Sequence, residues 1–465
     1  MRPFSMRDKL GYTLGDLGCC CTEQFRAMYL SVFYTLILQV NPFHIGILML
    51  ITKIWDAVND PIIGAIVDSR KATKGGKFIP WIRAFSFPMA VLCILGFVNV
   101  SNLAYGLRLA YMFVTYVLYE ALYTCVNVPF GTLSSVMTDD VRHRTALSRY
   151  RSLGGTIFMT VIVMVGPLVL YVDNKPVAGR FLMLASVFAL IGLLCLQITC
   201  VWCKERVAVP ERPKGEKLNY LHVIREIAKN KALLGVMFFS LVGMIGASVV
   251  NGLNTYLFKD YFGNVKIMAV SGGLSVLYSL ITFAITQPLA DKLGKKEWCC
   301  WGAGFAAAVF ALLFFFPIHN PVLFIVINGV CYLGASGMQV LIWAMVNDSI
   351  DYHELQTGER NEGIVYSTYS FFRKLASAVS GSLSSFVLGF IGYNVAEGAV
   401  QTAEVSNAIW KSYTGIYVLG YGVAVAILFF VYPLTKAKTT EMLEQLKARR
   451  AEKASAVETD GEQCP

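Results

Sequence analysis

The chain has 465 residues, of which 56% are apolar and only 15% charged, and its mean hydropathy is +0.56. Soluble domains carry roughly 45–50% apolar and about 25% charged residues, so the composition argues against a soluble enzyme, a disordered protein and a disulfide scaffold. The formal net charge is +10, but the basic residues fall in short clusters between apolar runs, which is not the pattern of a nucleic-acid surface. The sequence predicts an all-α polytopic membrane protein.

Twelve transmembrane helices are expected, because a spanning helix needs about 20 mainly apolar residues. The predicted spans are 10–39, 43–68, 79–103, 107–138, 148–172, 178–203, 232–258, 267–290, 297–318, 320–347, 362–392 and 408–434. A basic stretch with two prolines, 204–231, lies midway and predicts a cytoplasmic linker between two six-helix bundles, 1–203 and 232–435. The charged cytoplasmic tail, 436–465, is helix-prone at first and then expected to be disordered.

The distribution of lysine and arginine predicts the orientation in the membrane. With both termini placed in the cytoplasm, thirty of the 40 basic residues fall in cytoplasmic segments and six on the opposite side. Because basic residues collect in cytoplasmic loops, we expect a multi-pass protein of the plasma (cytoplasmic, or bacterial inner) membrane with both ends inside. The polar start, Met1 to Lys9, and the long apolar run after it do not fit a cleavable signal peptide.

The first span carries a polar stripe. Asp16, Cys20 and Glu23 follow helical spacing and share one face. Arg26 lies three residues beyond Glu23, so the two could form an internal ion pair, or either could contact a substrate, Arg26 an anionic one.

The second span holds the strongest chemical signal, the string "KIWDAVNDP". Asp56 and Asp60 are four residues apart on one face, with Asn59 beside them. Carboxylates inside a membrane cost roughly 2.5–3.5 kcal/mol each, so the pair needs a partner. A hard cation such as Na⁺ suits these oxygen ligands, and a proton is the other option. The alternative is a pair of salt bridges, for example to Lys53.

Matching cytoplasmic turns follow spans 2 and 8. Asp68 stands in "GAIVDSRKATKGGK" and Asp291 in "QPLADKLGKKE", each followed by basic residues. Two six-helix halves with equivalent features are typical of a duplicated transporter, whose substrate site lies near mid-membrane between the halves.

Two further charged stretches predict turns at matching places in the halves, "TDDVRHR" and "DSIDYHELQTGER". We interpret Asp139, Arg142, Asp351 and Arg360 within them, with Asp68, Asp291 and Arg26, as a gate or charge network. Ordinary solvated charge is the alternative.

The sequence contains no phosphate-binding, nucleophile or zinc motif, and its twelve cysteines lie mostly in apolar runs. Enzyme activity or a bound cofactor is therefore not expected.

Five strings in register, "GYTLGD", "KIWDAVNDPIIGAIVDSR", "GKFIPWI", "NVPFGTL" and "GERNEGIVYSTYSFFRKLASA", resemble the glycoside–pentoside–hexuronide:cation symporters. The similarity runs from about residue 8 to 435. These are major facilitator proteins, with melibiose permease as a familiar member. The resemblance implies a cation site formed by Asp56, Asn59, Asp60 and a span-4 threonine, here Thr124, which could equally bond back to its own helix.

The implied sugar site departs from the melibiose permease pattern. Two aspartates that bind sugar hydroxyls there are Cys20 and Asn127 here, and an aromatic surface is replaced by Gly131. Arg151 and Lys374 match basic positions near the family's sugar and cation pathway. Of the adjacent Arg373 and Lys374 only one should face a cavity, and we favour Lys374.

The substrate-binding candidates are therefore Cys20, Glu23, Asn127, Arg151 and Lys374. We expect a symporter that couples inward movement of Na⁺, with Li⁺ or H⁺ as other options, to uptake of a sugar or glycoside by alternating access. The basic residues make a hexuronide one option. A carrier of a lipid or organic anion and a non-transporting receptor are the alternatives. The expected partners are the solute, the cation and the bilayer, with a monomer as the functional unit.

Overall fold

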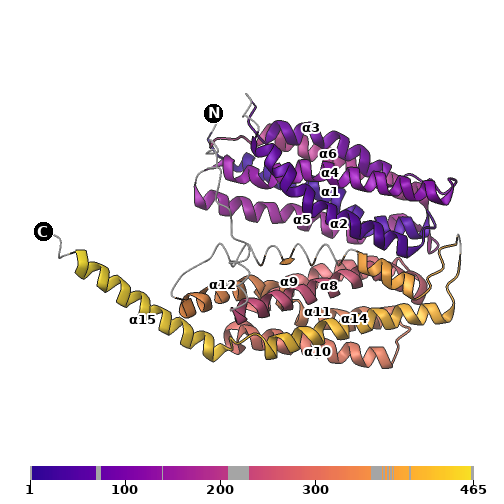
Figure 1. Ribbon diagram of the computed structural model, residues 1–465. Coiled ribbons are helices and arrows are strands. Elements are labelled where there is room, and N and C mark those ends of the chain that lie inside the picture. Colours follow the sequence, from indigo (N-terminus) through magenta and orange to yellow (C-terminus); the bar gives the residue numbers. More distant parts are fainter. Residues whose placement is uncertain are drawn as a thin grey trace. The chain divides into compact units, whose positions relative to one another are not determined.

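The computed structural model describes residues 3–69, 75–138, 140–207, 230–357, 382–396 and 399–461, and single positions between 369 and 380. The described chain is helical apart from one small hairpin (Figure 1). Its elements are α1 (Met6–Leu36), α2 (Pro42–Ser69), α3 (Ile79–Leu95), α4 (Tyr105–Met137), α5 (Val141–Leu170), β1 (Tyr171–Val172), β2 (Lys175–Pro176), α6 (Ala178–Trp202), α8 (Lys231–Tyr256), the π-helix η1 (Leu257–Tyr261), α9 (Ile267–Leu293), α10 (Lys295–Phe315), α11 (Pro321–Ala335), α12 (Gly337–Thr357), α14 (Ala403–Phe430) and α15 (Lys436–Gly461).

Eight helical stretches among the described residues are long and apolar enough to cross a membrane. The longest are α4 and a stretch from Pro321 to Gln356 that joins α11 to α12. Helices α1 and α2 have 31 and 28 residues, enough to span, but they carry the charged side chains of the predicted site. The eleventh predicted span, 362–392, lies largely outside the described residues. The all-helical, multi-pass architecture expected from the sequence is confirmed.

Three local expectations were wrong. The predicted turn "DSIDYHELQTGER" is helical as far as α12 extends, to Thr357, because its polar residues continue a helix that begins in the apolar run. In "TDDVRHR" helix α5 already starts at Val141, and the Asp140 carboxylate caps it by accepting the Arg142 N–H at 2.7 Å. The tail stays helical to Gly461 rather than ending early in disorder.

The described chain divides into two compact units. Unit 1 comprises Met1–Pro213, Asn251–Gly273 and Gly381–Ile409, and unit 2 comprises Lys214–Val250, Leu274–Ser380 and Trp410–Pro465. The predicted division into bundles 1–203 and 232–435 stays a prediction.

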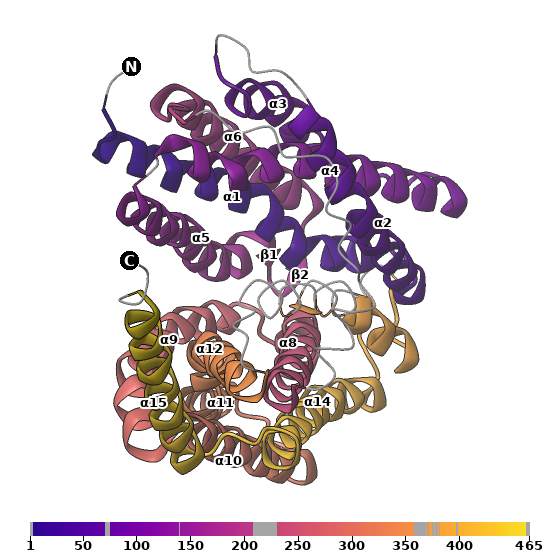
Figure 2. The ribbon, with the colours of Figure 1, turned by 60° about the vertical axis from the view of Figure 1, so that its left-hand side comes forward.

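Unit 1 is built around α1, which packs mainly against α5 and α6, while α3 packs on α4 and α6, and α2 on α4 (Figure 2). Its core is apolar and aromatic, with Tyr12 and Phe130 stacked at 4.7 Å between ring centres. At the crossing of α1 and α6, a Cβ on Gly18 would lie 2.8 Å from the Gly192 carbonyl oxygen. Only glycine allows the two backbones this close approach, the usual means by which membrane helices associate.

The hairpin β1–β2 ties a later segment of the chain into unit 1. Its turn residues Asp173 and Asn174 both have positive φ, as a tight two-residue hairpin turn requires. The Asn174 amide donates to the Lys259 carbonyl and accepts the Val265 N–H, both at 2.9 Å. Asn174 thereby provides hydrogen-bond partners for a backbone carbonyl within η1 and a backbone N–H just after it, which regular α-helical hydrogen bonding does not pair there.

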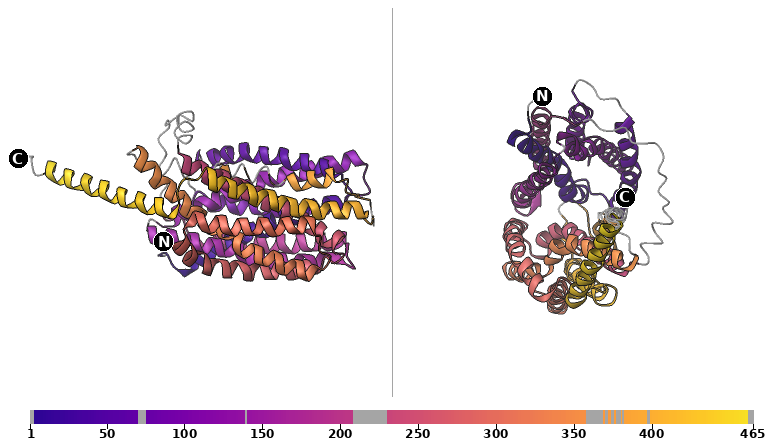
Figure 3. Two further views of the ribbon diagram at one scale, coloured as in Figure 1. Left: turned by 90° about the horizontal axis from the view of Figure 1, so that it is seen from below. Right: turned by 90° about the vertical axis from the view of Figure 1, so that its left-hand side faces the viewer.

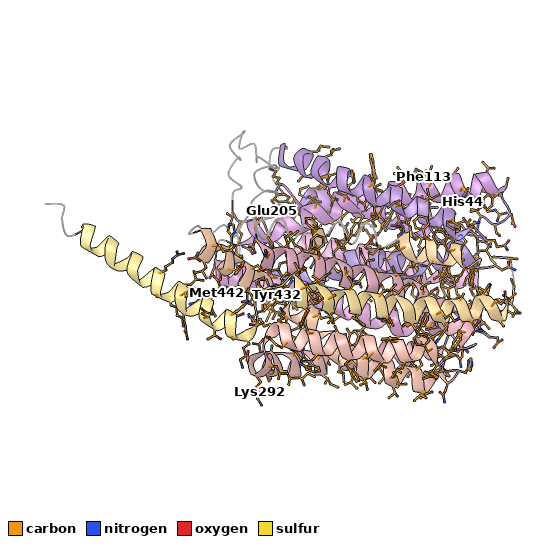
Figure 4. All side chains as sticks on the ribbon, turned by 60° about the horizontal axis from the view of Figure 1, so that its bottom comes forward. His44, Phe113, Glu205, Lys292, Tyr432 and Met442 are labelled. Carbon is orange, nitrogen blue, oxygen red and sulfur yellow. The ribbon has the colours of Figure 1, made fainter. Side chains whose placement is uncertain are left out.

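Unit 2 has its own core, formed by apolar residues of α8, α9, α10, α12, α14 and α15. The yellow helix α15 extends beyond the other helices of this unit toward the C-terminus (Figure 3). Met442 of the tail helix α15 is buried in this core together with Tyr432, and both are labelled in Figure 4. Arg449 donates to the Leu355 carbonyl near the end of α12 at 2.9 Å. The tail is therefore a packed element of unit 2.

Two residues at the start of the predicted linker, Glu205 and Arg206, fasten the ends of several helices in unit 1. The Glu205 carboxylate accepts the N–H groups of Lys77, Phe78 and Ile79 at 2.7–2.8 Å, which caps the start of α3. Gly76, with φ of +104°, makes room for that carboxylate. Figure 4 shows Glu205 and His44 at opposite ends of unit 1.

Arg206 completes this fastening. Its guanidinium Nη2 donates to both oxygens of Asp8, at 3.0 and 3.1 Å, and Asp8 is fully buried. The Arg206 N–H donates to the Val136 carbonyl at the end of α4 at 2.7 Å. Two consecutive residues therefore join the ends of α1, α3 and α4.

We predict that Glu205→Ala lowers the stability of the protein by about 2 kcal/mol, because three helix-terminal N–H groups lose a charged acceptor. The thermal unfolding midpoint of the purified protein in detergent measures the change. Glu444→Ala on the exposed face of α15 is the matched control. Equal midpoints for the two variants would show that the cap contributes nothing.

Candidate functional site

The predicted polar residues of unit 1 come from four helices. They are Asp16, Cys20, Glu23 and Arg26 on α1, Lys53, Asp56, Asn59 and Asp60 on α2, Thr124 and Asn127 on α4, and Arg151 on α5. The described contacts join most of them into two groups, one around Asp56 and one around Asp16.

In the first group, α2 meets α4 through Asp60 and Thr124. The Thr124 hydroxyl donates to Asp60 Oδ1 at 3.0 Å. Asp56 Oδ2 accepts the Lys53 ammonium at 3.1 Å, and its other oxygen is buried without a hydrogen-bond partner among the described residues. Asn59 is 5% exposed, and its amide nitrogen also lacks a partner. The salt bridge to Lys53 that the sequence left open is therefore formed, while oxygen ligands for a cation are still available.

A residue that the sequence analysis missed, Glu120 on α4, connects α1 with α2. Arg26 Nη1 lies 3.3 Å from Glu120 Oε1, and Lys53 Nζ lies 4.0 Å from Glu120 Oε2. The Arg26 and Glu120 side chains are almost fully buried. The Arg26 guanidinium also lies 3.4 Å from the centre of the Tyr119 ring, a cation–π contact.

This arrangement corrects the suggestion that Arg26 pairs with Glu23. Arg26 turns toward α4, because Glu120 and the Tyr119 ring together stabilise its charge better than a neighbour on its own helix. A signal for Glu120 was present in the sequence. It is an ionisable residue inside a predicted span, four residues before Thr124 and on the same helix face.

The first group holds more negative than positive charge. Its carboxyls are Glu23, Asp56, Asp60 and Glu120, and its bases are Arg26 and Lys53. With every group ionised, the charge is minus two. Glu23 interacts electrostatically with Glu120, Lys53, Arg26 and Asp56, and its Oε2 is buried and forms no hydrogen bond with the part of the chain that the structure describes. Buried, unpaired oxygens are costly, so the group is arranged to bind an added positive charge.

The second group is centred on Asp16. Arg151 Nε donates to Asp16 Oδ1 at 3.0 Å, and the Gly155 N–H donates to Asp16 Oδ2 at 2.9 Å. The Cys20 thiol donates to the same oxygen at 3.8 Å, and Gln24 donates to the Cys20 sulfur at 3.4 Å. Arg151 and Cys20, both predicted substrate contacts, therefore share one carboxylate, whose role was not assigned from the sequence.

The remaining predicted residues are placed as follows. Asn127 is half-buried on α4. Arg142 and Asp291 are exposed, and Asp291 accepts the Gln287 amide at 3.0 Å. Asp351 lies half-buried on α12, where the neighbouring acidic residue Asp348 pairs with Lys295 at 2.7 Å. Four predicted positions, Asp139, Arg360, Lys374 and the side chain of Asp68, lie outside the described residues. Arg373 is exposed.

Comparison with known proteins shows the family to which the chain belongs. The family described as MFS/sugar transport protein matches residues 11–436. The chain belongs to this family. The resemblance to the glycoside–pentoside–hexuronide:cation symporters is thereby confirmed, and the protein is a membrane transporter, not an enzyme.

Relatives match over nearly their whole length. An uncharacterized symporter of Bacillus subtilis (strain 168) is 31% identical, covering 95% of each chain. The isoprimeverose transporter of Lactiplantibacillus pentosus is 29% identical over 97% of this chain and 93% of its own. A putative glycoside/cation symporter of Escherichia coli (strain K12) is 27% identical over 98% of each chain.

Among solved structures, a nucleoside transporter matches with a TM-score of 0.61 and 14% identity, covering 90% of this chain and 99% of that chain. At this identity the likeness concerns the fold alone. It confirms the major facilitator fold expected from the sequence.

We predict that Arg26→Gln destabilises the protein by about 3 kcal/mol or more, because it leaves the buried Glu120 with only the more distant Lys53. The double variant Arg26→Gln with Glu120→Gln should recover part of this loss, since two neutral amides need no counter-charge. Thermal unfolding of both variants measures the difference, with the exposed Arg142→Gln as control. A double variant less stable than Arg26→Gln alone would contradict the pairing.

Proposed function

We propose that this protein is a Na⁺-coupled symporter that takes up a sugar or glycoside by alternating access. The observation that carries the proposal is the excess of two carboxylates over bases in the buried and half-buried group on α1, α2 and α4. A monovalent cation bound there reduces the excess charge, and carboxylate, amide and hydroxyl oxygens are the donors that a hard cation prefers. The putative glycoside/cation symporter among the relatives supports the same reading.

We assign Asp56, Asn59, Asp60 and Thr124 as the cation ligands. Asp60 is already oriented by the Thr124 hydroxyl, and Asp56 keeps one oxygen unpaired. A cation between the two carboxylates competes with Lys53 for Asp56. Lys53 has a second carboxylate within reach, Glu120 at 4.0 Å, so it can release Asp56 without becoming an isolated buried charge.

Coupling follows from this exchange of partners. If cation binding shifts Lys53 toward Glu120, it changes the field at Glu23, which interacts with both. Glu23 and Asn127 are the proposed contacts for sugar hydroxyls. By linkage, the sugar must raise cation affinity as much as the cation raises sugar affinity, typically by about 1–3 kcal/mol.

The two ion pairs favour a neutral glycoside over a hexuronide. Arg26 is paired with Glu120 and Arg151 with Asp16, so an acidic sugar must displace a protein carboxylate to reach either guanidinium. The isoprimeverose transporter among the relatives is consistent with a neutral substrate. A hexuronide is the second candidate, held by Arg151, the more exposed of the two arginines.

We predict that Asp60→Asn lowers Na⁺-stimulated uptake of the transported sugar about tenfold or more, because one charged ligand of the cation is worth roughly 1.5–3 kcal/mol. Uptake into right-side-out vesicles, with Na⁺ or K⁺ outside, measures it. Asp173→Asn, the same change in the exposed hairpin turn, is the control. Full Na⁺ stimulation in Asp60→Asn would refute the cation assignment.

The substrate class is tested by thermal shift with the purified protein. We expect neutral glycosides, pentosides among them, to raise the unfolding midpoint, and to do so more in Na⁺ than in K⁺, because a bound ligand stabilises by mass action. Glucuronides should have less effect. Stabilisation by glucuronides alone would select the hexuronide reading, and equal shifts in Na⁺ and K⁺ would speak against Na⁺ coupling.

A further inference from the structure

A cavity of about 430 Å³ lies between α3 and α6 in unit 1, close to where Glu205 caps α3. Two basic side chains, Arg83 and Lys204, line it and are exposed. The rest of its wall is largely apolar, from Ile79, Pro80 and Ala84. None of the predicted cation and sugar ligands is among the residues that line the cavity, and the proposed transport cycle does not use it.

We propose that this cavity binds the phosphate headgroup of an anionic membrane phospholipid. The charge at the cavity fits such a ligand, because among the described residues no carboxylate lines it. Glu205 follows Lys204 in the chain, but its carboxylate accepts three N–H groups at the start of α3 and is occupied there. Within the described residues, Arg83 donates from Nη2 to the Cys200 carbonyl at a long 3.4 Å and also interacts with the Cys200 thiol, which leaves most of its five donors for a phosphate.

The surroundings of the cavity fit the acyl chains of a lipid. Phe87 and Val91 follow Arg83 on the same face of α3 and are 62% and 39% exposed. On α6, Val201 and Leu194 are also largely exposed. In a membrane protein, exposed apolar faces such as these contact lipid, so the basic pair stands at the end of a lipid-facing surface.

The position along the membrane normal favours the same ligand. Arg83 and Lys204 belong to segments that the distribution of basic residues assigns to the cytoplasmic side. Basic pockets between transmembrane helices on this side are a recurrent setting for anionic headgroups. A soluble phosphate would gain the charge contacts but not the contacts with the apolar helix faces, so a lipid fits the site better.

The test uses the full-length protein, purified in detergent and stripped of lipid. Its thermal unfolding midpoint is measured with phosphatidylglycerol, with phosphatidylcholine of the same acyl chains, and with inorganic phosphate. We expect phosphatidylglycerol to raise the midpoint most and phosphate not at all. The variant Arg83→Gln with Lys204→Gln should lose about half or more of the effect specific to phosphatidylglycerol.

The matched control is Arg149→Gln with Lys292→Gln, which removes two exposed basic residues away from the cavity. An unchanged phosphatidylglycerol effect in the cavity variant, or an equal loss in the control, would overturn the proposal. Equal stabilisation by inorganic phosphate would also overturn it, in favour of a small-anion site. If the double variant does not fold, Lys204→Glu alone makes the same test, because the Lys204 side chain is exposed and its change removes a positive charge from the cavity.

Discussion

Six ionisable side chains, buried or half-buried on three neighbouring helices, form the constraint on which unit 1 depends. Each charge removed from water needs a partner, and the partners come from different helices: Arg26 on α1 with Glu120 on α4, and Lys53 on α2 with both Asp56 and Glu120. Such pairs fix how α1, α2 and α4 are rotated about their axes, because a small rotation would leave a charge unpaired in a low-dielectric interior. The apolar packing of Gly18 against Gly192 then holds α1 close to α6.

The sequence predicted the helices well, because a spanning segment is identified from its own composition. The start of α6 and the start of α9 agree with the predicted spans. Ends were harder to predict where polar residues continue a helix beyond the apolar run, as α12 does to Thr357. Hydropathy gives the depth of a residue in the membrane and not the point at which helical hydrogen bonding ends.

For the candidate site, helical spacing predicted which polar side chains share a face of one helix, but not which side chains of different helices form ion pairs. It placed Asp56 and Asp60 on one side of α2, and the contact of Asp60 with Thr124 agrees with the family resemblance. It could not show that Arg26 forms its salt bridge with Glu120, because Glu120 lies 94 residues later in the chain. The pairing of Arg151 with Asp16 likewise joins α5 to α1 over 135 residues. Contacts between helices depend on rotation and tilt, which a single sequence does not contain.

The nature of Lys53 connects the structural and the transport roles of the buried group. A lysine is a compact charge on a flexible stem, whereas an arginine such as Arg26 is a planar group fixed here by Glu120 and the Tyr119 ring. Arg26 therefore suits a permanent link between α1 and α4. Lys53, with Asp56 at 3.1 Å and Glu120 at 4.0 Å, suits a charge that changes partners when a cation enters. Because carboxylates outnumber bases in this group, Lys53 can exchange Asp56 for Glu120 at little cost in free energy. The lysine has a carboxylate partner before and after the cation binds, and only the carboxylates alternate between lysine and cation.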